Sequence, residues 1–214
     1  MLKKHTLVVG PFQCNCSVLV CEKTKEAIVI DPGDEFSRIQ EWCSKSRITL
    51  KYAVHTHAHL DHIGAVSELK RWCPTMKIAL HKDDDQLYQN LPMQGQLFGF
   101  SYDVPPPVDH FVNDEEVLKF GEHEFSVIHT PGHSPGGICL HFQGGVLSQE
   151  PVMFTGDTLF QQSIGRTDLW GGDHRTLIKS IKSRLLTKDE QTRVFPGHGA
   201  ATSIGIEAKQ NPFL

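Results

Sequence analysis

The sequence has no apolar stretch that approaches the roughly 18 residues needed to cross a membrane. Near the N-terminus the apolar run covers only residues 7–9, because Gly10 and Pro11 interrupt it. That run is too short for the core of a signal peptide. We therefore expect a soluble, non-secreted protein that works in the cytoplasm and has no membrane partner.

The chain also lacks an excess of basic residues. It carries 21 Lys and Arg against 25 Asp and Glu, which gives a formal net charge of −4. This charge balance argues against a protein that binds nucleic acid through a basic surface. No repeat at a fixed period and no long linker divides the 214 residues. We therefore expect one domain over residues 1–214.

Paired Cys-x-x-Cys motifs are absent as well, which argues against a structural zinc module. The six cysteines are scattered, and the closest two are Cys14 and Cys16. In an extended segment these two side chains point to the same face. They are either a redox pair or reduced thiols buried as small hydrophobic groups, as a reducing compartment favours.

Short β-type runs alternate with helical patterns, which predicts a mixed α+β fold with partly antiparallel sheets. Predicted helices cover residues 36–43, 63–72, 83–91 and 176–186. Strands are predicted at residues 18–20, 27–30, 52–55, 77–80, 117–120, 124–128, 138–142, 152–155 and 193–195. Residues 92–110 are expected to be irregular. Their apolar side chains either wall a substrate cleft, pack within the loop or form a subunit contact.

Histidine is the residue in unusual supply, with 13 copies, and its placement is informative. His57 and His59 stand two apart between a predicted strand and a predicted helix, so their side chains can converge on one point. Asp61 and His62 follow at the turn into the helix. Four such groups in six residues suit a zinc, iron or manganese site better than a polar loop.

Three further segments place candidate ligands after predicted strands, each beside glycine or proline. These ligands are His133, Asp157 and His198. Singly, each would be a turn residue more often than a metal ligand. Together with the first segment they supply enough donors for two adjacent metals.

These residues resemble the metallo-β-lactamase superfamily, whose signature is His-x-His-x-Asp-His followed by separate His, Asp and His ligands. The resemblance covers nearly the whole chain and implies a four-layer αββα sandwich with metals at one edge. It implies that one metal is held by His57, His59 and His133. It implies that the other is held by Asp61, His62 and His198, with Asp157 bridging. Two divalent metals are expected, zinc being favoured over iron and manganese.

Within this superfamily the chain looks most like the glyoxalase II group, in particular its short, single-domain bacterial members. The supporting segments are TPGHSPG at 130–136, FTGD at 154–157, GRTD at 165–168, PGHG at 196–199 and NPFL at 211–214. Longer glyoxalase II enzymes add a helical region that grips glutathione, whereas only residues 199–214 follow the last ligand here. The resemblance implies a hydroxyacylglutathione hydrolase-like enzyme and leaves the glutathione part of the substrate open.

The implied reaction is attack of a metal-bound hydroxide on a thioester such as S-lactoylglutathione, followed by release of a thiolate. Asp61 is expected to orient the hydroxide. Asp31 either accepts a hydrogen bond from a ligand imidazole or caps the turn at Asp31-Pro32-Gly33. Arg166 either binds a substrate carboxylate or pairs with Asp168 within its own loop.

Two other functions remain open on the sequence. Persulfide dioxygenases of the same superfamily use a single iron at positions that match His57, His133 and Asp157, and they also carry a Gly-Arg-Thr-Asp segment. The additional set that includes His198 favours the hydrolase. A metal-binding interaction protein without activity is the second alternative. The oligomeric state is not predicted.

Overall fold

A computed structural model describes residues 1–143 and 150–214. Its first sheet has the strand order β1-β2-β3-β4-β5-β6. The first three strands pair antiparallel, and the pairs from β3 to β6 are parallel. The strands are β1 (Leu2–Val9), β2 (Cys14–Cys21), β3 (Glu26–Ile30), β4 (Thr49–Val54), β5 (Lys77–His81) and β6 (His110–Val112).

The second sheet has the order β14-β13-β10-β9-β8-β7 and is antiparallel except for the parallel pair β10 and β13. Its strands are β7 (Val117–Phe120), β8 (His123–His129), β9 (Ile138–Phe142), β10 (Val152–Gly156), β13 (Arg193–Pro196) and β14 (Thr202–Ser203). A separate small hairpin joins β11 (Leu159–Phe160) to β12 (Ser163–Ile164).

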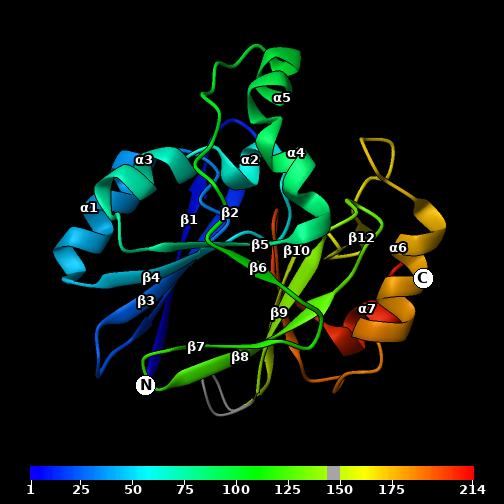
Figure 1. The fold of residues 1–214 in the computed structure, drawn as a ribbon. Helices are drawn as coiled ribbons and strands as arrows, with labels where there is room; N and C mark the ends of the chain where they lie inside the picture. The colour runs from blue at the N-terminus through cyan, green and yellow to red at the C-terminus, as the bar shows by residue number, and fades with distance from the viewer. Residues whose placement is uncertain (144–149) are drawn as a thin grey trace.

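Helices cover the outer faces of both sheets (Figure 1). Those of the first half are α1 (Phe36–Ser46), α2 (Leu60–Ile63), α3 (Val66–Trp72), the short 3₁₀ turn η1 (Lys82–Asp84), α4 (Asp85–Gln89) and α5 (Leu91–Phe98). The second half contains α6 (His174–Ser180), a π-helical turn η2 (Ile181–Leu185) and α7 (Ile204–Gln210). None of the helices in the described ranges is long and apolar enough to cross a membrane.

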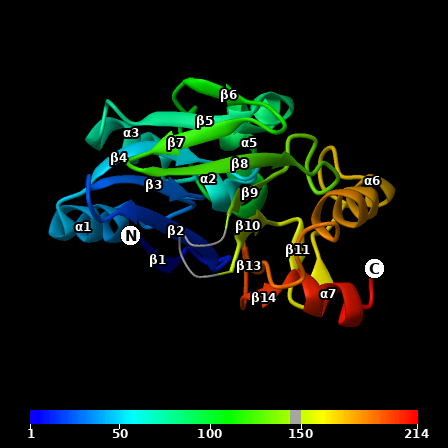
Figure 2. The same ribbon diagram turned by 90° about the horizontal axis from the view of Figure 1, so that it is seen from below.

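Three apolar clusters define the layers. Leu19 and Val54 of the first sheet pack with Leu140 and Phe142 of the second, so a core lies between the sheets. The outer face of the first sheet packs on α1 and α3, and that of the second packs on α6, η2 and α7. Figure 2 shows the two helical layers on opposite sides of the molecule. The predicted αββα sandwich is therefore confirmed.

The predicted helices and strands are found, with several differences. The elements that were not predicted are β1, β6, β11, β12, β14 and α7. The predicted helix 63–72 is the end of α2 followed by α3, and the predicted helix 176–186 is α6 followed by η2. Residues 92–110, expected to be irregular, contain most of α5. Pro92 is tolerated there because it stands in the first turn, and Gly99 ends the helix at a φ of 79°. Burial of Leu91 and Gly95 provides the packing that fixes this helix.

Cys14 and Cys16 lie on one face of β2, as alternation predicts, and both are buried in the cluster under α1. All six cysteines are free thiols. Burial raises the pKa of the Cys14 thiol to about 12, which keeps it protonated near neutral pH. This arrangement agrees with the second interpretation, small buried hydrophobic groups, rather than with a reactive pair.

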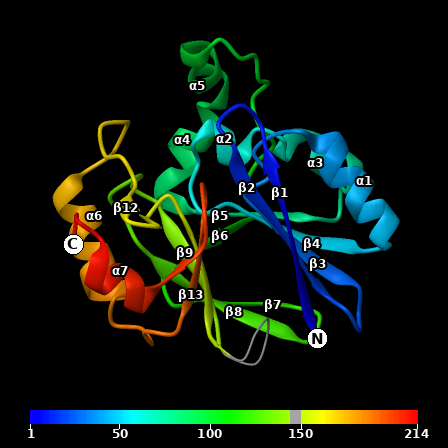
Figure 3. The same ribbon diagram turned by 180° about the vertical axis from the view of Figure 1, so that it is seen from behind.

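The ends of several strands meet at the edge of the sandwich beside α2 and α4. Figure 3 shows that edge and α5 at the end of the molecule opposite to the N-terminus. The loop after β4 and the loop after β8 both reach this edge, and so do the loops after β10 and β13. These four connections, the first of which includes α2, carry the candidate metal ligands.

Candidate metal centre

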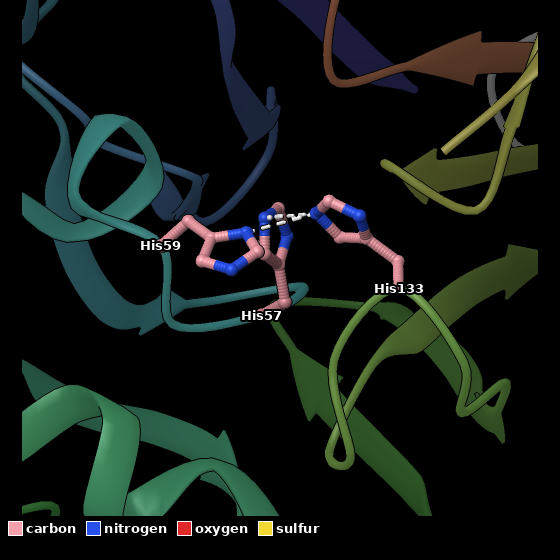
Figure 4. Close-up of side chains that lie close together, drawn as sticks. All are labelled: His57, His59 and His133. Carbon is pink, nitrogen blue, oxygen red and sulfur yellow. Dashed lines mark hydrogen bonds between the residues drawn. The ribbon is translucent and has the colours of Figure 1, made fainter. Parts of the chain in front are cut away.

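The first cluster joins His57, His59 and His133. His57 and His59 stand in the loop between β4 and α2, and His133 stands in the turn after β8. Nδ1 of His59 lies 2.9 Å from Nε2 of His133, which lies 3.2 Å from Nε2 of His57. Figure 4 shows the three rings pointing toward one another. All three side chains are buried.

The second cluster joins Asp61 and His62, both on α2, to His198 after β13. Nε2 of His198 lies 3.1 Å from Oδ2 of Asp61 and 3.2 Å from Nε2 of His62. His62 is fully buried, whereas Asp61 and His198 keep part of their surface exposed. The open side of this cluster faces solvent.

Asp157, which follows β10, stands between the two clusters. Its Oδ1 lies 3.4 Å from Nε2 of His62 in the second cluster. Its Oδ2 lies 3.6 Å from Nε2 of His133 in the first cluster and 3.7 Å from Nε2 of His198. The structure therefore brings all seven side chains predicted as ligands to one place.

Glycines next to these side chains leave room for close backbone approach. A Cβ on Gly165 would lie 1.8 Å from the carbonyl oxygen of Asp157. A Cβ on Gly197 would lie 2.3 Å from Oδ1 of Asp157. The Gly-Arg-Thr-Asp and Pro-Gly-His-Gly segments thus need glycine because any side chain would collide with the candidate centre.

Hydrogen bonds on the far side of the rings fix which nitrogens face the centre. Nδ1 of His133 donates to the carbonyl oxygen of Arg166 at 2.7 Å. Thr56 Oγ1 donates to Asp31 at 2.7 Å and accepts from Nδ1 of His57 at 3.2 Å. These tautomers are assigned from the hydrogen-bond network. They leave Nε2 of both rings unprotonated and directed at the cluster.

Burial and charge set the protonation of the centre. Burial and the neighbouring His133 lower the pKa of His59 to about 3, so its imidazole is neutral near pH 7. For Asp61, burial raises the pKa, but His62 and His198 outweigh it and lower the pKa below its usual range. Neutral His59 and ionised Asp61 are the forms in which these groups bind metals. For His62 and His198 burial lowers the pKa, but the neighbouring acidic groups outweigh it and raise the pKa, so a metal would bind these two rings by displacing a proton.

The donor set fits divalent metals on two observations. Lone pairs of several nitrogens and carboxylate oxygens converge within 4.8 Å, where they would repel one another without a cation between them. In addition, the buried Oδ1 of Asp157 has no hydrogen-bond partner among the described residues. Imidazole with carboxylate suits zinc, iron and manganese alike.

Asp84 connects two of the ligand loops and was not predicted from the sequence. Its Oδ2 accepts from the backbone N–H of Ala58 at 2.9 Å and from Ser134 Oγ at 2.8 Å. Its Oδ1 accepts from the N–H of Gly136 at 2.6 Å. Asp84 is fully buried although it stands in the acidic run 83–85, which has the appearance of a solvated turn.

Asp31 and Arg166 behave differently. Asp31 is buried with its Oδ2 3.1 Å from Nδ1 of His62, as expected for a hydrogen-bond acceptor behind a ligand ring. The Arg166 side chain forms two hydrogen bonds of 2.7 Å to Asp168, which is the intra-loop pair considered as its alternative role. The backbone carbonyl of Arg166, not its side chain, contacts a candidate ligand.

A cavity of about 410 Å³ opens beside the centre. Five of the candidate ligands line it: His59, Asp61, His133, Asp157 and His198. This volume lies within the range usual for small-molecule sites. A substrate bound here would contact the clusters directly.

Comparison with known proteins places the chain in a family. The profile of the metallo-beta-lactamase superfamily matches residues 9–198. Hydroxyacylglutathione hydrolase GloC of Haemophilus influenzae is 40% identical over 212 residues, which cover 96% of this chain and 95% of that protein.

Solved structures of similar fold support the same family. The crystal structure of the BLEG-1 B3 metallo-beta-lactamase has a TM-score of 0.89 at 40% identity, and the match covers 100% of this chain and 99% of that chain. TTHA1623 in a di-iron-bound form has a TM-score of 0.87 at 36% identity, and the match covers 98% of this chain and 100% of that chain. ETHE1 from Myxococcus xanthus has a TM-score of 0.80 at 25% identity, with 98% and 83% coverage. The chain belongs to the metallo-beta-lactamase superfamily of metallo-hydrolases.

Proposed function

We propose that the chain is a hydrolase of thioesters, with a hydroxyacylglutathione such as S-lactoylglutathione as a substrate. The observation that carries this proposal is the pair of adjacent His/Asp clusters with Asp157 between them. The similarity to hydroxyacylglutathione hydrolase GloC of Haemophilus influenzae supports the substrate class. The cavity beside both clusters supports a small-molecule substrate.

In this proposal His57, His59 and His133 hold one divalent metal, zinc being favoured. Asp61, His62 and His198 hold the second, and Asp157 reaches both. Two divalent metals, when bound, lower the pKa of water toward neutrality and polarise a carbonyl group.

The protein's own part in the reaction falls to Asp61. Its carboxylate lines the cavity and is ionised, so it can accept a hydrogen bond from the attacking water and orient it. A thiol has a pKa of about 8.5, so the sulfur leaves as a thiolate without an acid to protonate it. The proposed reaction therefore needs no acid in the cavity besides the candidate metal ligands.

The persulfide dioxygenase alternative needs one iron, held by His57, His133 and Asp157. It would leave the cluster of Asp61, His62 and His198 without a role. The short distances within that cluster favour the hydrolase.

Metal content and turnover test the proposal together. We expect two metals per chain by elemental analysis and rapid loss of the thioester of S-lactoylglutathione. One iron per chain, with oxygen consumed only in the presence of glutathione persulfide, would establish the dioxygenase instead. Metal binding with neither reaction would favour an interaction protein.

A further inference from the structure

The cavity beside the candidate centre has an apolar wall that the metal chemistry does not require. Leu97 and Phe98 at the end of α5 line it, together with Leu169 and Trp170 from the loop between β12 and α6. Figure 1 shows α5 and that loop rising at the same end of the molecule. Phe12, from the turn between β1 and β2, completes the wall and stacks edge-on with Phe98 at 5.5 Å.

These side chains are largely exposed although they are large and apolar: Leu97 is 71% exposed, Trp170 52% and Phe98 46%. Large apolar groups that gather at one exposed place mark a binding surface more often than scattered ones do. Here they border a cavity whose floor is the candidate centre. The surface is therefore placed to bind the part of a substrate next to its reacting bond.

The polar groups in the same cavity are already engaged. Arg166 is the one Lys or Arg among the described residues that line it, and its guanidinium is paired with Asp168. The amide of Gln94 accepts from the N–H of Leu60 and donates to the carbonyls of Ala58 and Leu87. A substrate carboxylate would find no unpaired cationic side chain in this lining.

From these observations we infer that the cavity selects thioesters that carry an apolar group, such as an aromatic ring or branched alkyl chain, next to the scissile bond. This inference rests on the proposed thioester hydrolysis and specifies its substrate class. The apolar group is recognised by the wall of Phe12, Leu97, Phe98 and Trp170. Charged groups of the thiol are left to solvent at the mouth of the cavity.

Two matched substrate pairs test the inference and separate the two sides of the thioester. S-mandeloylglutathione against S-lactoylglutathione replaces a methyl by a phenyl group on the acyl side. The lactoyl thioester of benzyl mercaptan against that of methyl mercaptan adds a ring on the thiol side. We expect kcat/KM to rise about tenfold or more in at least one pair. Equal kcat/KM within both pairs would overturn the inference while leaving thioester hydrolysis intact.

Variants of the apolar wall show whether the higher kcat/KM of the substrate with the ring depends on this surface. Leu97→Ala and Phe98→Ala are expected to bring the ratio of kcat/KM between the two substrates of a pair toward one. Val104→Ala and Phe111→Ala are the controls, since these side chains are 66% and 39% exposed and do not line the cavity. They should leave the ratio as in the unaltered chain. A ratio that survives both wall variants would contradict the assignment of this surface.

Binding of unreactive thioethers keeps the inference testable if no thioester is hydrolysed. S-benzylglutathione and S-methylglutathione differ only in the apolar group, and their binding to the metal-loaded protein can be measured by calorimetry. Absence of all hydrolysis would refute the proposed function alone. Tighter binding of the benzyl compound by about tenfold would still support apolar selection, and equal binding would refute it.

Discussion

The carboxylate of Asp31 lies behind both candidate metal clusters. Its Oδ2 is 3.1 Å from Nδ1 of His62 and accepts a 2.7 Å hydrogen bond from Thr56 Oγ1, which in turn contacts Nδ1 of His57. One buried carboxylate thus orients a ring of each cluster. Its φ of 51° is a left-handed conformation that Asp and Asn tolerate better than most residues.

Asp31→Asn should weaken metal binding while preserving the backbone of the turn. An amide cannot accept from Thr56 N–H, Thr56 Oγ1 and His62 together as the two carboxylate oxygens do. We expect metal affinity to fall about 10–100-fold, as measured by competition with a chromophoric chelator.

Asp34→Asn is the matched control for that substitution. Asp34 stands in the same segment, but its carboxylate accepts from the N–H of Glu35 instead of contacting a ligand ring. Its variant should bind metal as the unaltered chain does. Equal metal affinity in the Asp31 and Asp34 variants would show that Asp31 serves the turn alone.

Asp84→Asn should disturb the first cluster through the loops that carry it. Three donors surround the carboxylate, and an amide group would face at least one of them with its own N–H. Leaving a buried donor unpaired costs about 1–3 kcal/mol. We expect lower stability in urea and also weaker metal binding, because Ala58 and Ser134 adjoin candidate ligands.

Asp109→Asn separates these two effects. Asp109 also accepts from a backbone N–H, that of Ile78, and from Lys70, but it lies away from the ligand loops. Its variant should lose stability with metal affinity unchanged. Should the Asp84 variant behave in the same way, Asp84 would have a purely structural role.

The difference between Asp84 and the signature residues shows what the sequence could reveal. His57, His59, Asp61 and His62 lie within six residues, so local spacing alone predicts that the two pairs face adjacent points. Asp84 meets the 130–136 turn only through tertiary packing, about 50 residues along the chain. Nothing in the acidic run around it distinguishes a buried acceptor from a solvated charge.

The same reason explains the other differences. The role of Arg166 in the centre is played by its carbonyl oxygen, a group that every residue carries and no side-chain pattern reveals. α5 contains Pro92 and Gly95, which disfavour a helix locally, and the packing of Tyr102 against Gly95 becomes visible only in the fold. The layers were predictable because the resemblance covers most of the chain, whereas these details depend on contacts distant in sequence.

Gly165→Ala should displace Asp157. The added Cβ would lie 1.8 Å from the carbonyl oxygen of Asp157 and 3.2 Å from Cβ of His133, so the backbone must shift. We expect a loss of about 1–3 kcal/mol in stability from overpacking, together with reduced metal content by elemental analysis.

Gly99→Ala provides a control of comparable cost. Gly99 has a φ of 79°, and no atom of the described residues lies within 4 Å of its Cβ position, so alanine there is strained by about 1–2 kcal/mol without a collision with them. Its metal content should remain that of the unaltered chain. Equal metal content in both glycine variants would mean that close approach at Gly165 is not needed for the centre.

His198→Ala tests the second cluster most directly. His198 contacts Asp61 and His62 but lies outside the cluster of His57, His59 and His133. We expect metal content to fall from two to one per chain. Hydrolysis of S-lactoylglutathione should fall by about 100-fold or more, because loss of a group that merely orients a metal ligand already lowers metal affinity or activity by about 10–100-fold. His174→Ala, an exposed histidine at the start of α6, should change neither quantity. If the His198 variant keeps full hydrolysis with one metal, the reaction needs only the first cluster and Asp157, and the two-metal proposal is wrong.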